Sequence, residues 1–203
     1  MREGCVRWAM ALALLLGASA GAEPGGKGSA EWLVRTPFYE GFPAEAVAAL
    51  RPDDTAQLTA LLDDPDELET HAAALEVLGM AGHPGAYEAI SAYAAQLGPG
   101  ELEPAAFRAC LAVPIALGHL AAEDPRALRD LSKMARQPAV EAHYRHLARP
   151  ALERLIAEMA IAGLGQSRSA AADGVLEGLV RDGVAPDHAA SALRDRAARS
   201  PLP

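Results

Sequence analysis

The segment from Leu58 to Tyr93 constrains the fold most, because its apolar residues recur with the period of an α-helix. Spacings of i, i+3 and i+4 indicate helices that bury one face against a neighbour. Three such stripes follow one another: Leu58, Leu61 and Leu62, then Leu75 and Leu78, then Ile90, Tyr93 and Leu97. The pattern predicts an all-α fold of short helices that are stabilised by packing against one another.

A capped turn separates the first two predicted helices. Asp64 can accept a backbone N–H at a helix start, and Pro65 fits the first helical position. Glu67 would complete a capping box. The acidic stretch 63–69 lacks the Gly and Glu positions of a calcium loop, so we assign its acids to helix capping. We expect His71, one turn further on, to be solvated or half-buried.

The unit of two helices recurs along the chain. Gly79 and Gly118 lie 39 residues apart, and each is followed by a proline and another apolar helix. We align Gly165 with Gly82, and the 83 residues between them correspond to two periods of about 41. Helix pairs with periods near this length are typical of α-solenoids. Two prolines, Pro114 and Pro150, are expected to bend or divide the later helices.

The residues that mark the repeat are Asp63-Asp64-Pro65, the run from Ala73 to Gly79, and Gly82-His83-Pro84 leading to Ile90. In these residues the chain resembles the HEAT-repeat family, particularly the short bacterial HEAT-like repeats also found in phycobilisome lyases. The resemblance covers 50–95, extends less closely over 104–135 and is weak beyond 150. It implies an α-solenoid, a right-handed superhelix of HEAT-like helix pairs over 51–203, whose curved surface binds protein partners.

The first 20 residues have the composition of a secretory signal peptide. Arg2 and Arg7 precede an apolar run over 8–16, and Ala18-Ser19-Ala20 is typical of a cleavage site. The apolar run is shorter than the roughly 20 residues that span a bilayer, so we favour a cleaved signal over an uncleaved membrane anchor. We therefore expect an exported protein, periplasmic or secreted, whose Gly-rich residues 21–30 form a flexible tether.

Residues 31–50 are rich in aromatic side chains, namely Trp32, Phe38, Tyr39 and Phe42. We interpret this segment as an N-terminal cap, because repeat arrays need their apolar ends covered. An anchor patch for a partner protein is the alternative, since Trp and Tyr dominate the energetics of many interfaces.

The charges of the chain are unevenly distributed. Without residues 1–20 the chain carries 16 basic and 26 acidic side chains, which argues against nucleic acid and anionic membranes as partners. Residues 40–103 hold thirteen acids and a single base, Arg51, whereas residues 104–203 hold thirteen bases and eleven acids. The acidic half either keeps the protein soluble or attracts a basic partner, which includes the Arg-rich end of a second copy.

Residues capable of catalysis or metal binding are few. We interpret Cys110, which lies in an apolar run, as an inert buried thiol. His143 and His146 could share a metal on one helical face with Glu141, but this pair is a weak candidate and we predict no metal site and no cofactor. Nucleophile elbows and phosphate-binding fingerprints are absent from the sequence.

The sequence therefore predicts an exported, non-enzymatic adaptor or scaffold that binds a protein partner through a HEAT-like surface. A metal-dependent or lyase-like enzyme and a self-associating structural protein are the alternatives. The candidate partner-binding residues are Trp32, Phe38, Tyr39, Asp63, Asp66, Glu67 and Glu69.

Overall fold

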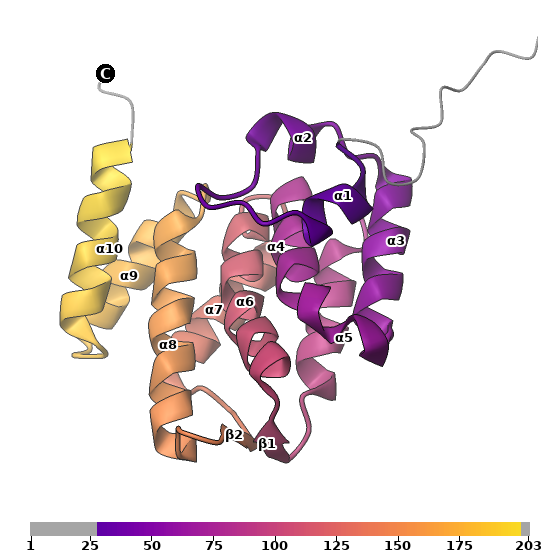
Figure 1. The fold of residues 1–203 in the computed structure, drawn as a ribbon. Helices are drawn as coiled ribbons and strands as arrows, with labels where there is room; N and C mark the ends of the chain where they lie inside the picture. Colours follow the sequence, from indigo (N-terminus) through magenta and orange to yellow (C-terminus); the bar gives the residue numbers. More distant parts are fainter. Residues whose placement is uncertain (1–27, 200–203) are drawn as a thin grey trace, which may run out of the picture.

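The structure, a computed structural model, describes residues 28–199; the expected signal peptide and most of the expected tether lie outside this part. Within it, ten α-helices are joined by one 3₁₀-helix and two short strands (Figure 1). In chain order these are α1 (Ala30–Arg35), α2 (Ala44–Ala48), α3 (Pro52–Asp63), η1 (Pro65–Thr70), α4 (His71–Ala81), α5 (Ala86–Gln96), β1 (Gly100–Leu102), α6 (Pro104–Leu120), α7 (Pro125–Arg136), β2 (Ala142–Tyr144), α8 (Arg149–Gln166), α9 (Ala171–Arg181) and α10 (Pro186–Arg199). The prediction of an all-α fold is confirmed. Over residues 28–199, no helix combines the length and apolar character needed to cross a bilayer.

From α3 onward the helices pack as successive pairs. Helices α3 and α4, α5 and α6, α7 and α8, and α9 and α10 contact each other within their pairs. Helices α4, α6, α8 and α10 also pack one against the next, and we call these four helices the even row. Figure 1 shows α4, α6 and α8 side by side in the middle of the molecule, with α10 at one edge.

Glycines bring neighbouring helices of the even row into backbone contact. A Cβ atom added at Gly79 would lie 2.3 Å from the carbonyl oxygen of Ala116, and one added at Gly118 would lie 2.4 Å from that of Gly163. Such distances are too short for any larger residue without movement of the backbone. Gly79 and Gly118, noted in the sequence for their spacing, therefore mark the crossings of α4 with α6 and of α6 with α8.

The alignment of Gly165 with Gly82 was wrong. Gly82 ends α4 in the left-handed conformation, with φ of 64°, which glycine adopts without the steric cost of a Cβ. Gly165 instead lies inside α8, where it faces Ala192 of α10. Its role matches that of Gly79, because it allows two helices to approach, and it ends no helix.

Pro114 does not divide its helix, whereas Pro150 marks the start of one, as its place in the sequence indicated. Helix α6 continues through Pro114 from residue 104 to residue 120. Pro150 stands in the first turn of α8, where a missing N–H leaves no intrahelical bond unmade. A turn separates it from strand β2, which pairs in parallel with β1 so that Gly100 lies opposite Ala142.

The turn before α4 follows the sequence prediction in part. Asp64 caps η1, since its Oδ1 accepts the N–H of Asp66 at 2.9 Å. The capping box through Glu67 does not form, because the N–H of Asp64 donates to the carbonyl of Leu61 and the Glu67 carboxylate binds Arg35.

The expectation of a solvated or half-buried His71 was wrong, since its side chain is only 3% exposed. Its Nε2 lies 3.0 Å from the carbonyl oxygen of Asp64, and its Nδ1 lies 3.1 Å from the hydroxyl of Tyr93. Both ring nitrogens thus have partners inside the fold, which offsets the cost of removing them from water.

Candidate binding pocket

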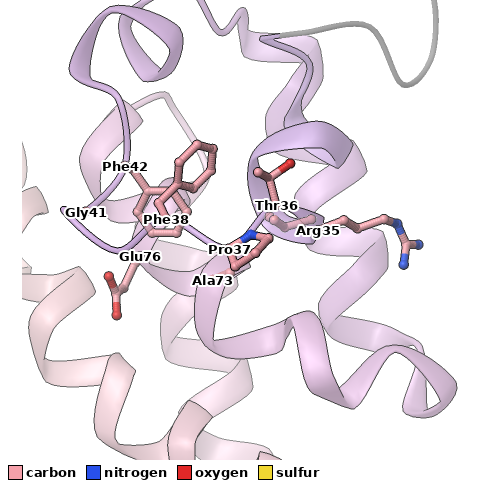
Figure 2. A pocket seen from close by; sticks show the side chains of 9 residues that line it. Arg35, Thr36, Pro37, Phe38, Gly41, Phe42, Ala73 and Glu76 are labelled. Carbon is pink, nitrogen blue, oxygen red and sulfur yellow. The ribbon is translucent and has the colours of Figure 1, made fainter.

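The main candidate site is a pocket between the N-terminal segment and α4 (Figure 2). Its volume is about 430 Å³, within the range of roughly 300–1,000 Å³ found for small-ligand sites. Residues that line it include Arg35, Pro37, Phe38, Phe42, Ala73 and Glu76. The pocket thus combines aromatic and aliphatic walls with one carboxylate.

Local sequence explains how the N-terminal segment reaches α4. The Ser29 side chain caps α1 by accepting the N–H of Trp32 at 3.1 Å, and Pro37 follows soon after the helix ends at Arg35. Gly41 then takes a φ of 86°, a left-handed conformation that favours glycine in a turn. Helix α1 packs against α3 and α4, and α2 packs against α4.

The aromatic rings of this segment support one another. The rings of Trp32 and Phe38 meet edge to face with centroids 5.2 Å apart, and Phe38 and Phe42 lie 5.7 Å apart. All three side chains are half-buried against the main core. Phe38 and Phe42 therefore form a fixed wall of the pocket.

Glu76 supplies the only carboxylate among the residues that line the pocket. It is half-buried on α4, and burial raises the pKa of its carboxyl above its usual value. Within residues 28–199, no hydrogen bond or ion pair to its carboxylate is found. Its carboxylate is therefore partly desolvated but still reaches solvent.

The neighbouring cation does not neutralise Glu76. Arg35 places its Nη2 2.7 Å from Glu67 and its Nε 3.2 Å from Glu31. Figure 2 shows the Arg35 guanidinium and the Glu76 carboxylate pointing to opposite sides of the pocket. The same pocket is therefore lined by two aromatic rings and by a carboxylate that has no ion pair within residues 28–199, a combination suited to a cation with an apolar stem.

The aromatic residues proposed from the sequence are divided by the fold. Phe38 lines the pocket, and Trp32 packs edge to face against it while both lie partly buried against the core. Tyr39 is 98% exposed. Only Tyr39 therefore offers a whole aromatic side chain to a partner.

The four acidic residues proposed from the sequence also differ in their surroundings. Asp63 and Asp66 are exposed at the turn around η1. Glu67 binds Arg35 of α1, and Glu69 forms an ion pair with Arg108 of α6. Two of the four thus have partners within the chain, which leaves Asp63 and Asp66 as the more available pair.

Sequence reasoning missed Glu76. A signal for it exists, because Glu76 is the one acid in the otherwise apolar run from Ala72 to Ala81. An isolated acid in an apolar helix is a candidate for a binding residue, because the apolar packing of the helix does not require a charge.

The histidine pair does not stand on a helix. His143 lies in strand β2 and His146 in the following turn, and both are exposed. The ring of Tyr144 stacks on Phe107 at 4.3 Å and meets His146 edge to face. In the described part of the chain, no group of three or more His, Cys, Asp or Glu residues could hold a metal ion.

Cys110 is buried, as the sequence indicated, with 6% of its surface exposed. Burial raises the pKa of its thiol to about 11. A thiol with so high a pKa holds little thiolate near neutral pH, so the side chain fits a packing role.

A second pocket lies between the turn after α4 and the turn after α6. Its arginine is held within the chain, because Arg126 pairs with Asp124 at 2.6 Å and with Glu88 at 2.8 Å. The same guanidinium lies 4.1 Å from the centre of the Tyr87 ring. This pocket offers less to a ligand than the one around Glu76.

No protein-family model, curated protein or solved structure matches this chain.

Proposed function

We propose that this protein is a non-enzymatic binding module, an exported adaptor or scaffold that recognises another protein. The helix pairs from α3 to α10 and the continuous even row support a HEAT-like solenoid as its architecture. In this proposal residues 31–50 are the N-terminal cap, residues 51–203 the repeats, and residues 1–30 the signal peptide and tether.

The observation that carries the proposal is the unpaired Glu76 carboxylate in an aromatic pocket. Partial burial disfavours the charged form of Glu76, and no ion pair within residues 28–199 offsets this. Perturbed ionisable groups in clefts mark functional sites more often than chance. In a binding role, a cationic group of the ligand would pair with the Glu76 carboxylate.

The test is capture of a partner by the tagged full chain in its own cells, with crosslinking and mass spectrometry. We expect a reproducible protein that is lost with Glu76→Lys and retained with Glu177→Lys. Glu177 is exposed on α9, so the second variant changes net charge equally at a distant surface.

Three results would contradict the proposal. One is recovery of the bait alone after crosslinking. Another is stoichiometric metal in the purified protein, which would favour the enzyme alternative. The third is a mass in solution that rises with concentration while no partner is captured, which would favour self-association.

A further inference from the structure

We propose that the pocket of Glu76, Phe38 and Phe42 receives a single arginine side chain from a segment of the partner protein. This inference rests on the proposed protein-binding function and adds the chemistry of the contact. It follows from the charge, the walls and the surroundings of the pocket.

The charge of the pocket selects a cation. Glu76 has no ion-pair partner among residues 28–199, and Arg35 is held by Glu31 and Glu67. An anionic ligand would be repelled by the carboxylate, and a neutral one would bury it further without compensation. A cation removes this cost by pairing with Glu76.

The walls of the pocket favour arginine over lysine. Phe38 and Phe42 present half-buried rings inclined at 59° to each other, next to Ala73 on α4. A guanidinium is planar, stacks on aromatic faces and can bind a carboxylate through two parallel hydrogen bonds. An ammonium group is a compact, strongly hydrated charge that uses such a wall less fully.

The surroundings favour a protein segment over a free small molecule. Tyr39 follows Phe38 directly and is 98% exposed, as expected of an aromatic anchor outside a pocket that becomes buried on binding. Glu40 and Glu45 are exposed on the same segment, and they add negative charge that attracts a basic chain.

The experiment is a titration of the ¹⁵N-labelled full chain with the blocked pentapeptide Gly-Ser-Arg-Ser-Gly, followed by NMR. The matched peptides carry citrulline, a neutral isostere, or lysine in place of arginine. We expect shifts confined to amides near residues 36–42 and 73–76, with at least tenfold weaker binding of the citrulline peptide and weaker binding of the lysine peptide. Blocked arginine alone should bind more weakly than the pentapeptide.

Variants test the assignment of the residues. Glu76→Gln keeps the shape of the side chain and should weaken binding of the arginine peptide at least tenfold, whereas Glu177→Gln should leave it unchanged. Phe42→Leu keeps an apolar wall without the ring and should reduce the preference for arginine over lysine. Unchanged spectra outside the pocket show that each variant is folded.

Equal binding of the arginine and citrulline peptides, or no effect of Glu76→Gln, would overturn the inference. If blocked arginine binds as tightly as the pentapeptide, the inference that the arginine belongs to a protein segment would be wrong. The proposed protein-binding function is tested independently by the capture experiment, and it fails if the wild-type chain captures no partner. A captured partner that binds Glu76→Gln equally well leaves that function standing and rejects this pocket.

Discussion

The contact between His71 and Tyr93 shows how a single pair of residues joins three elements. The carbonyl of Asp64 can only accept a hydrogen bond, so the imidazole donates to it through Nε2–H and accepts the Tyr93 hydroxyl at Nδ1. Burial, with a smaller contribution from Cys110, raises the pKa of Tyr93 to about 12, which keeps this hydroxyl protonated. The pair therefore ties the turn before α4 to α5.

Removal of that hydroxyl is expected to destabilise the fold. Tyr93→Phe leaves the Nδ1 of a buried imidazole without a donor, at a cost of about 1–3 kcal/mol. Tyr39→Phe is the matched control, because that ring is 98% exposed and its change should lie within about 0.5 kcal/mol of zero. Urea denaturation of both variants measures the effect, and equal free energies of unfolding would contradict the role of the pair.

Glu76 should make stability depend on pH. Its pKa in the folded state is raised by burial above the ordinary value of 4.5, so the folded chain binds more protons than the unfolded chain between these two pKa values. The contribution of Glu76 is therefore most favourable at acid pH and is lost as pH rises through the folded pKa. We expect Glu76→Gln to be more stable than wild type at about pH 7 and nearly equal at about pH 4.

Urea denaturation across that pH range measures the difference, with Glu177→Gln as the control. A Glu76→Gln variant less stable than wild type at neutral pH would show that the carboxylate has a partner in the fold.

At the scale of elements, small residues decide how closely the helices pack. Gly79 meets Ala116 between α4 and α6, and Gly118 meets Gly163 between α6 and α8. Gly165 of α8 faces Ala192 of α10, and a Cβ added at Gly165 would lie 3.1 Å from the Cβ of Ala192. Each step of the even row thus uses a glycine in one helix against a small residue in the next.

Gly118→Ala should be among the most disruptive small substitutions in the chain. Its Cβ would lie 2.4 Å from the carbonyl oxygen of Gly163, so two backbones must separate, at an expected cost of about 1–3 kcal/mol or more. Gly174→Ala is the matched control, because the same change in helix α9 meets no atom within 4 Å. It should stabilise the protein by about 0.5–1 kcal/mol through helix propensity.

Thermal unfolding of the two alanine variants checks both signs. A Gly118→Ala protein as stable as wild type would mean that α6 and α8 separate at little cost.

At the scale of the molecule, some acids of the acidic half form ion pairs with arginines of the C-terminal half. Arg108 pairs with Glu69, Arg126 with Glu88 and Arg145 with Glu101. The paired residues lie 38–44 positions apart, so each pair joins segments that are distant in the chain. Because these pairs are exposed, they contribute little to stability and mainly lower the free charge of the acidic half.

Hydrogen exchange should report how extensively each helix is packed against its neighbours. Helix α6 packs against α4 and α8 and is buried along most of its length, whereas α2 has few buried residues and α10 ends the row. We expect the slowest exchange in α6 and the fastest in α2 and the end of α10, since local opening needs less free energy where few contacts break. Mass spectrometry of the exchanging full chain measures this, and equal protection of α6 and α10 would show all-or-none opening.

The sequence by itself determined the helices. The apolar stripes around Leu58, Leu75 and Ile90 lie on α3, α4 and α5, because helical periodicity and capping are local properties of the chain. The cap at Asp64 follows for the same reason. Helix α6 shows where local prediction fails. The local penalty of Pro114 would break the helix, but burial of the surrounding helix outweighs it.

The tertiary structure decided which residues meet. The burial of His71 depends on Tyr93, the role of Gly165 on Ala192, and the charge left on Glu76 on the capture of Arg35 by Glu31 and Glu67. These contacts join residues that are far apart in the chain. The local sequence pattern does not indicate which distant residues come close together in space. The pocket around Glu76 consequently emerges only when the N-terminal segment packs on α4, since neither element forms it alone.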